Sequence, residues 1–178
     1  RVNRITHLAY AAQRYWTIPE ISVKLSKMNI SDQNSSFSIG DVVYPRPTTL
    51  GPRLQNHLQL VYVHEGEFTV QVDRRAYDVA AGQATLLLPG HAELFRFANH
   101  GTTRHGWCQV DQPQLSPAAV EQLAARPETL PFTPAMQTLV RLAWPLARVR
   151  DRGSRQYRDA LIQAIFQEFI SRSGCVKA

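Results

Sequence analysis

The sequence predicts a mainly β fold: a small antiparallel barrel or sandwich, followed by helices. Between residues 20 and 110, short segments of alternating apolar and polar residues recur about every 8–12 residues, separated by Gly or Pro turns. After Asp111 the apolar residues change to helical spacing. The 178 residues, 44% of them apolar, suffice for one such domain with a helical appendage.

The N-terminal third predicts one helix and two strands. Apolar residues at helical spacing favour a short amphipathic helix over residues 3–16, which Pro19 ends. Alternation over residues 21–25 indicates a strand with one buried face. A second strand is expected at Phe37–Tyr44, interrupted at Gly40, and the Pro-rich stretch 45–52 is expected to be a loop.

The central third predicts a series of short strands. The first is His57–His64, and Glu65-Gly66 turns the chain into a segment in which Phe68, Val70 and Val72 alternate with polar residues. The remaining strands are expected around a tight hairpin at 73–75 and near residues 77–79, 85–88, 94–97 and 104–110.

Three helices are expected in the last third. Ser116-Pro117 and Thr133-Pro134 each combine an N-cap residue with a proline at the first helical position. The first helix should run to about Arg126, and Pro145 should break or kink the second. The last helix is predicted from about Arg155 to Ser171, after a polar break that contains Gly153.

The last helix carries an apolar stripe that is two residues wide. Such a stripe fits packing on the chain's own barrel, and it equally fits a seam between two copies of the chain. We predict it as the dimerisation surface, with the core alternative left open. Its members are Leu161, Ile162, Ile165, Phe166, Phe169 and Ile170.

Charge and cysteine content narrow the function class. The net charge of +6 is concentrated in residues 141–178, which carry eight Lys or Arg against three acidic residues. This indicates either a solvated helical surface or an end that lies near DNA. The two cysteines, Cys108 and Cys175, form neither a secreted disulfide framework nor a CxxC pair, so a reducing cytoplasm is expected. No apolar run has the length of a membrane span.

A family resemblance rests on the stretch Leu50–Phe97, LGPRLQNHLQLVYVHEGEFTVQVDRRAYDVAAGQATLLLPGHAELFRF, followed by TRHGW at 103–107. In its ordered turns and strands it resembles the cupin domain of bacterial AraC-type transcription regulators. The resemblance implies a cupin-type double-stranded β-helix, or jelly-roll barrel, followed by C-terminal helices. It also implies an N-terminal arm at 1–19, a barrel at 20–112, and a helical linker and dimerisation segment at 113–178.

The resemblance also separates a sensor from an enzyme. The positions that hold metal ligands in cupin enzymes fall here on Pro52, Leu54, Gln59 and Phe95, which are poor ligands for a divalent metal. A shifted site would need His57, His64 and His91, but His57 and His64 are an odd number of residues apart and so face opposite sides of one strand. We therefore expect no metal, no cofactor and no catalysis.

The resemblance implies a ligand-sensing and dimerisation domain. Its partners would be a small effector, for which a sugar-like molecule is one candidate, and a second copy of the chain. DNA would be bound only through a helix-turn-helix domain expected beyond residue 178. The alternatives are a free-standing sugar-binding or metal-dependent cupin enzyme, and a dimerisation module with a filled barrel. The expected effector-binding residues are Tyr44, Arg53, His57, Gln59, Phe95, His105 and Trp107.

Overall fold

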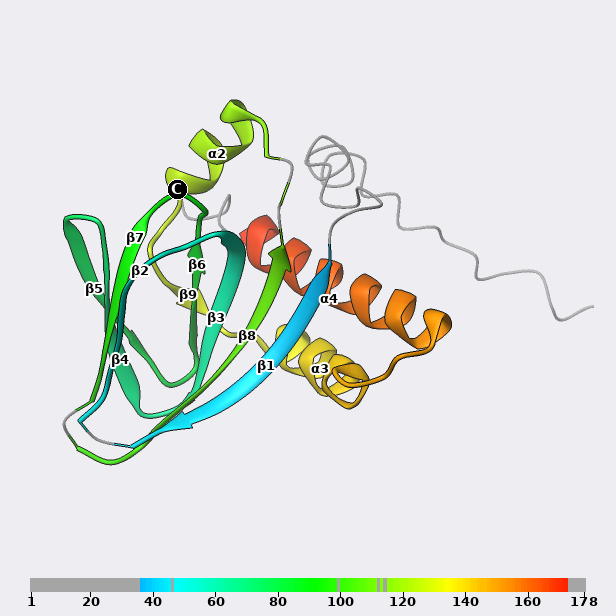
Figure 1. Cartoon of the computed structure of the whole chain (residues 1–178), viewed down its shortest axis with the longest axis horizontal. Coiled ribbons are helices and arrows are strands. Elements are labelled where there is room, and N and C mark those ends of the chain that lie inside the picture. The colour runs from blue at the N-terminus through cyan, green and yellow to red at the C-terminus, as the bar shows by residue number, and fades with distance from the viewer. Residues whose placement is uncertain (1–35, 46, 99, 112, 114, 173–178) are drawn as a thin grey trace, which may run out of the picture.

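The computed structural model describes residues 36–172 except 46, 99, 112 and 114. This part of the chain forms two antiparallel β-sheets that face each other, with helices beside them (Figure 1). The mainly β class with C-terminal helices is therefore confirmed. The helix expected at 3–16 and the strand at 21–25 lie outside the described residues.

The sheets contain five and four strands. The five-stranded sheet consists, in spatial order, of β1 (Phe37–Tyr44), β8 (Thr103–Asp111), β3 (His57–Glu65), β6 (Gln83–Leu87) and β9 (Leu130–Pro131). The four-stranded sheet consists of β2 (Thr49–Leu54), β7 (Ala92–Phe97), β4 (Glu67–Val72) and β5 (Arg75–Ala80). Because consecutive strands alternate between sheets at several points, the two sheets form the walls of one barrel.

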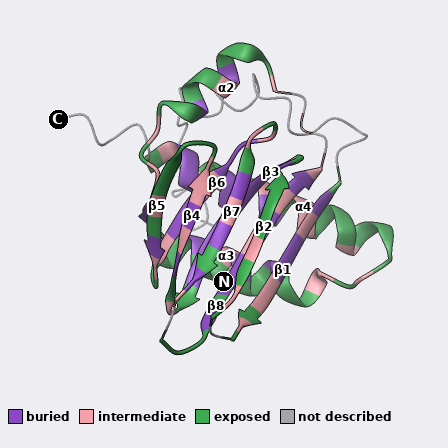
Figure 2. Cartoon of the chain, turned by 60° about the vertical axis from the view of Figure 1, so that its left-hand side comes forward, coloured by how far each residue is buried: buried purple, intermediate pink, exposed green. Residues whose placement is uncertain are grey.

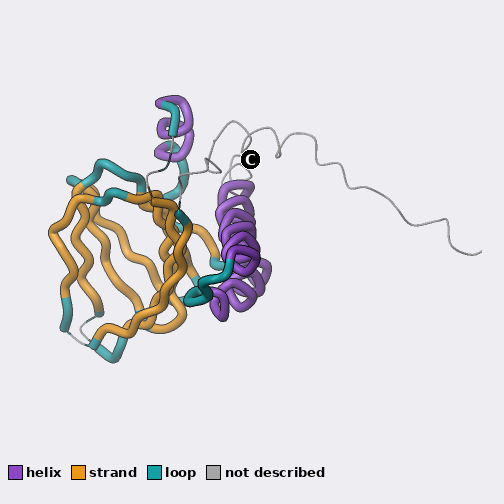
Figure 3. The backbone as a smooth tube through the Cα atoms, turned by 45° about the vertical axis from the view of Figure 1, so that its right-hand side comes forward, coloured by secondary structure: helices purple, strands orange, loops and turns teal. Residues whose placement is uncertain are grey.

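Four helical elements follow β8, and α3 and α4 lie side by side next to the five-stranded sheet (Figure 3). They are α2 (Pro117–Ala124), α3 (Pro134–Ala143), the 3₁₀ turn η1 (Trp144–Leu146) and α4 (Arg152–Arg172). None of the helices in the described part of the chain has the length and apolar character that a bilayer crossing requires.

Strict alternation in β3 divides the core into two layers. Leu58, Leu60 and Tyr62 face the helices, while Val61 and Val63 face the barrel interior. All five are buried, because this strand is covered on both sides. The four-stranded sheet has only one covered face, and in β7, for example, buried residues alternate with exposed or intermediate ones (Figure 2).

Two expectations in the first strands were wrong. β1 runs through Gly40 without interruption. The stretch 49–54, expected to be a loop in part, is strand β2, even though Gly51 and Pro52 stand in its middle and are joined by a cis peptide bond. A proline is tolerated there because β2 lies at the edge of its sheet, where an amide donor is not required on both sides.

The predicted helix starts are confirmed. The side chains of Ser116 and Thr133 accept hydrogen bonds from backbone amides of the first turns of α2 and α3. α3 ends before Pro145, as predicted. α4 begins earlier than expected, because Asp151 Oδ1 accepts a 2.8 Å hydrogen bond from the amide of Ser154 and so caps the turn.

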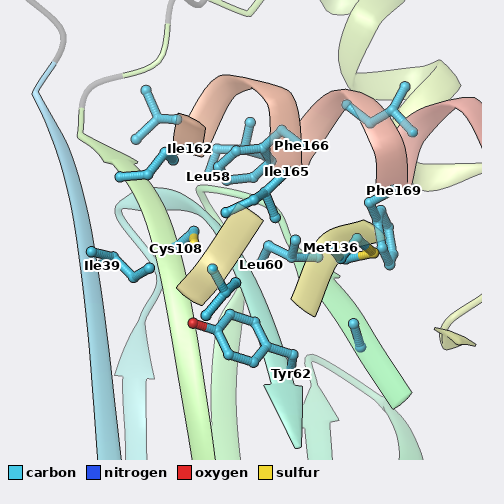
Figure 4. Packing of buried hydrophobic residues seen from close by; sticks show 14 of the residues in the cluster. Ile39, Leu58, Leu60, Tyr62, Cys108, Met136, Ile162, Ile165, Phe166 and Phe169 are labelled. Carbon is cyan, nitrogen blue, oxygen red and sulfur yellow. The ribbon is translucent and has the colours of Figure 1, made fainter. Parts of the chain in front are cut away.

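The apolar stripe of α4 lies within the chain's own core (Figure 4). Ile162, Ile165 and Phe166 are 0% exposed, and the other three members are also buried. They pack against the outer face of the five-stranded sheet, including Leu58 and Cys108. Of the two alternatives for the stripe, packing on the chain's own barrel and a seam between two copies, the structure shows the first. The prediction that they form a dimer seam is corrected, because the chain's own core already covers these six side chains.

Candidate functional site

A small cavity of about 130 Å³ lies inside the barrel, between the two sheets. Six of the seven expected effector-binding residues line it, together with three aliphatic residues; His57 is not among them. The lining residues are Val42, Tyr44, Leu50, Arg53, Gln59, Val61, Phe95, His105 and Trp107.

Strand pairing brings these residues together from five strands. In the five-stranded sheet Val61 pairs with Trp107, and Val42 pairs with His105. In the other sheet Leu50 pairs with Phe95. Side chains opposite each other in neighbouring strands point to the same face, so each pair contributes jointly to the cavity wall. His105 and Trp107, two residues apart on β8, therefore both point into the barrel.

Stacked rings form one wall of the cavity. The ring centroids of Tyr44 and Phe97 lie 4.0 Å apart, and those of Phe97 and His105 lie 5.5 Å apart with nearly parallel planes. Phe68 meets the His105 ring edge-on at 5.7 Å. These contacts hold the imidazole in one orientation, as rings prefer stacked or edge-to-face packing.

The imidazole of His105 is buried and incompletely bonded. The side chain is 6% exposed, and its Nδ1 has no hydrogen-bond partner among the described residues. Burial lowers the pKa of His105 to about 4, because the charged form loses its hydration in the barrel. The ring is therefore neutral at pH 7 and presents one polar atom that the protein leaves unsatisfied.

A chain of hydrogen-bonded polar side chains connects two of the cavity residues, Arg53 and Gln59. Glu93 accepts a 2.6 Å hydrogen bond from Arg53 Nε and a 3.2 Å bond from Gln55 Nε2. The same Gln55 amide nitrogen lies 3.1 Å from Gln59 Oε1, and Gln59 Nε2 donates over 3.1 Å to Gln109 Oε1. The orientation of Gln59, a cavity residue, is thus fixed through neighbours on both sides.

Glu93 is the charged centre of this chain. It is 1% exposed, whereas Arg53 is 43% exposed, so the ion pair joins a buried carboxylate to a guanidinium at the surface. Burial raises the pKa of Glu93, and the nearby Arg53 opposes that rise. The Arg53 guanidinium also lies 6.0 Å above the Phe95 ring. Because Glu93 neutralises Arg53, the cavity carries no net charge from this pair.

Sequence reasoning missed Glu93, Gln55 and Gln109. Glu93 and Gln109 could have been found, because period-2 alternation places Glu93 on the face of Phe95 and Gln109 on that of Trp107. Gln55 lies between β2 and β3, so no strand pattern predicts its direction. Its amide reaches inward because its backbone is bonded to the β6–β7 turn, through His91.

The histidines of the conceivable shifted metal site lie apart. His57 Nδ1 is 2.9 Å from Asp111, at ion-pair distance but without hydrogen-bond geometry. His64 pairs with Asp41 at 3.2 Å. His91 pairs at 2.7 Å with a third carboxylate, that of Asp73. Within residues 36–172, the described positions contain no group of three or more His, Cys, Asp or Glu side chains placed to hold one metal ion.

Comparison with known proteins identifies the kind of domain. The model of a family described as the AraC-like ligand binding domain matches residues 37–172. A search of curated proteins gives no match.

Solved structures with similar folds include two cupins. The cupin domain of Schizosaccharomyces pombe Cnp3 is 13% identical, with a TM-score of 0.41 over 43% of this chain and 57% of that chain. An RmlC-like cupin from Methanocaldococcus jannaschii is 15% identical, with a TM-score of 0.41 over 44% of this chain and 72% of that one. The chain thus spans less than two thirds of the length of the first.

Proposed function

The chain belongs to the family of AraC-like ligand-binding domains, and we propose that it is the effector-sensing and dimerisation part of an AraC-type transcription regulator. In this proposal a small molecule binds inside the barrel and is not chemically changed. DNA is reached only through a helix-turn-helix domain outside this sequence. A protein with that task works in the cytoplasm.

The unsatisfied nitrogen of His105 is the observation that carries the proposal. A buried polar atom without a partner costs free energy, commonly about 1–3 kcal/mol, and native proteins rarely retain one without a role. His105 lines the barrel cavity, and its imidazole is held there by the rings of Tyr44, Phe68 and Phe97. A ligand that hydrogen-bonds to this nitrogen would recover that free energy, which gives the protein a reason to keep the atom there.

The cavity favours a small, uncharged ligand. His105 is neutral at pH 7, and the charge of Arg53 is already matched by Glu93. A charged ligand would therefore enter without a counter-ion. The volume of about 130 Å³ lies well below the roughly 300–1,000 Å³ of drug-sized sites. Trp107 and Tyr44 supply aromatic faces, and Gln59 supplies an amide, which together suit a sugar-sized polyol.

Dimerisation would use the outer surface of the helices. Because the stripe of α4 is buried, a partner must contact other residues. Of the five large apolar side chains exposed in the described residues, three belong to the α3–η1–α4 region: Leu142, Trp144 and Tyr157. We place the dimer contact there. Two copies matter for a regulator because paired DNA-binding units address two half-sites at a fixed spacing.

Calorimetric titration and thermal unfolding test the ligand proposal. The probes are neutral aldopentoses and aldohexoses, with the matching uronates as charged controls. A neutral sugar at one hundred times its dissociation constant should stabilise the chain by about 2.7 kcal/mol. His105→Phe and Trp107→Ala should each abolish that gain. Binding that survives both substitutions would refute the barrel site.

The small cavity also gives some support to a second candidate function, a dimerisation module with a filled barrel. Phe68, Phe95 and Phe97 already occupy much of the interior. This candidate predicts no stabilisation by any probe in the panel. Stoichiometric zinc, iron or manganese in the purified protein would instead favour a metal-dependent cupin enzyme and contradict both.

A further inference from the structure

A second cavity, of about 480 Å³, lies at the end of the barrel that is closed by α2 and the loop after it. It is bounded by the β4–β5 hairpin, by β6 with the following turn, and by residues 123–128. The volume is within the range of small-molecule sites, which the barrel cavity is not. No lining residue is shared with the barrel cavity.

The inner wall of this cavity is apolar. It forms where the cluster inside the barrel meets the cluster beneath the helices, so residues from both layers contribute. These include Val72, Tyr77, Leu86, Leu88, Leu123 and Phe169. The Tyr77 hydroxyl lies 3.0 Å from Thr85 Oγ1 and is thereby satisfied. The wall can thus bind a hydrocarbon chain or ring without leaving a polar group unpaired.

The cavity is also lined by a half-buried cation. Arg126 lines it, and its Nη1 is inaccessible to solvent and has no acceptor among the described residues. Burial lowers the pKa of Arg126, but a guanidinium stays protonated at neutral pH. Of the other charged residues that line it, Arg75 pairs with Glu128 at 2.5 Å and His91 pairs with Asp73, while Arg74 is exposed to solvent.

We propose that this cavity is a second binding site, for an apolar molecule that carries one carboxylate. The hydrocarbon part would lie on the apolar wall. The carboxylate would accept charge-assisted hydrogen bonds from Arg126 and so give the buried Nη1 the acceptor that it lacks among the described residues. The site is independent of the barrel effector: it takes an anion, whereas the barrel cavity favours a neutral molecule.

Titration calorimetry with octanoate and octan-1-ol on the full chain separates the two halves of the site. Both probes have the same hydrocarbon tail, and only octanoate carries charge. Octanoate should bind about tenfold or more tightly than octanol, the range expected for hydrogen bonds to charged groups. Arg126→Gln should remove that advantage and leave octanol affinity unchanged. Arg148→Gln, at an exposed arginine outside the cavity, is the matched control and should change neither.

The location of binding is tested on the unmodified chain, so the result does not depend on how Arg126→Gln folds. Backbone amide signals of Leu88, Leu123 and Ala124 should shift with octanoate, while those of Gln59 and Trp107 should not. Three results would each overturn the proposal: no octanoate binding at millimolar concentration, equal affinity in wild type and a folded Arg126→Gln, or shifts centred on the barrel residues.

Discussion

Trp107 occupies the space that a side chain at Gly40 would need: a Cβ on Gly40 would stand 1.9 Å from Cζ2 of the indole. The two residues are cross-strand partners in β1 and β8. The glycine therefore lets the ring lie flat against the neighbouring strand, and the position of the ring shapes the barrel cavity. An aromatic ring packed over a cross-strand glycine also recovers packing that the glycine itself cannot supply.

Gly40→Ala should destabilise the fold and displace Trp107. Forcing an extra methyl group into a packed interior commonly costs about 1–3 kcal/mol. Gly40 and Trp107 both lie in the middle of the β1–β8 pairing, where the backbone cannot easily move aside. We expect the free energy of unfolding in urea to fall by that amount. The fluorescence maximum of the protein should shift as well, because one of its three tryptophans moves.

The matched control is Gly153→Ala. Gly153 lies in the first turn of α4, where the nearest atom to an added Cβ is 3.6 Å away. Alanine favours a helix over glycine by about 1 kcal/mol at most. This variant should be as stable as wild type or slightly more so. Equal stability of the two alanine variants would show that Trp107 readily vacates the space over Gly40.

The sequence alone misread Gly40 for a physical reason. A glycine followed by an aspartate usually weakens a strand, so an interruption was predicted there. What reverses the outcome is the ring of a residue 67 positions later in the chain, which is a tertiary contact. The same reason explains β2, where Gly51 and Pro52 look like a loop unless the strand is known to be an edge.

Acidification should destabilise the fold through His105. Its pKa is about 4 in the folded chain against 6.5 for an ordinary histidine, so between these values the unfolded state binds more protons. The full free energy of unfolding is therefore present above pH 6.5, and the part that depends on a neutral His105 is lost as the pH falls toward 4. With 1.36 kcal/mol per pKa unit, the loss is at most about 3 kcal/mol. His105→Phe keeps a ring in the stack and cannot titrate.

The measurement is urea unfolding of wild type and His105→Phe at pH 7 and pH 4. Other titrating groups act alike in both proteins, so they cancel in the comparison. Wild type should lose more stability on acidification than the variant does. If both proteins lose the same free energy of unfolding, His105 takes up no proton when the chain unfolds. The conclusion that it is neutral in the folded barrel would then be wrong.

Removing Arg53 should cost more than neutralising Glu93. Arg53→Met leaves a carboxylate that is 1% exposed without its counter-ion, whereas Glu93→Gln leaves a guanidinium that is 43% exposed and can reach water. We expect about 2 kcal/mol for the first and about 1 kcal/mol for the second, from the range for charged hydrogen bonds. In the double variant the two losses of stability should not add, because either substitution alone already removes the Arg53–Glu93 ion pair.

The pH dependence of Arg53→Met distinguishes charge from packing. Without the guanidinium, burial raises the pKa of Glu93 further, so the folded state holds a proton that the unfolded state releases. The cost of the substitution should therefore grow as the pH rises above 4.5, the ordinary value for this carboxyl. A cost that is constant with pH would mean that lost contacts with Phe95, rather than charge, dominate.

The sequence predicted those residues of the candidate site whose direction follows from the alternation of side chains along a strand. Resemblance placed Gln59 and Phe95, period 2 placed His105 and Trp107 on one face, and six of seven expected residues line one cavity. His57 was also expected in the site, because it is two residues from Gln59 on the same strand, but it stands at the end of that strand, beside Asp111. The unpaired state of His105 Nδ1 depends on every neighbour at once, so no local pattern predicts it.

Aspartate substitutions on α4 should separate the core from the dimer surface. Ile165→Asp with Phe169→Asp places two charges at positions that are 0% and 1% exposed. Burying an unpaired charge costs several kcal/mol, and a domain has about 5–15 kcal/mol in total. This double variant should be unfolded by circular dichroism. A folded monomer would instead restore the stripe as a dimer seam.

Leu142→Asp with Trp144→Asp tests the outward surface that we propose for the dimer. These side chains are 49% and 45% exposed, so aspartate at either position stays hydrated and should leave the fold intact. In a dimer that buries them, the same charges would be desolvated opposite their own copies, because a two-fold interface repeats each contact. Sedimentation should therefore show a folded monomer where wild type is a dimer. A variant that remains dimeric would place the interface elsewhere.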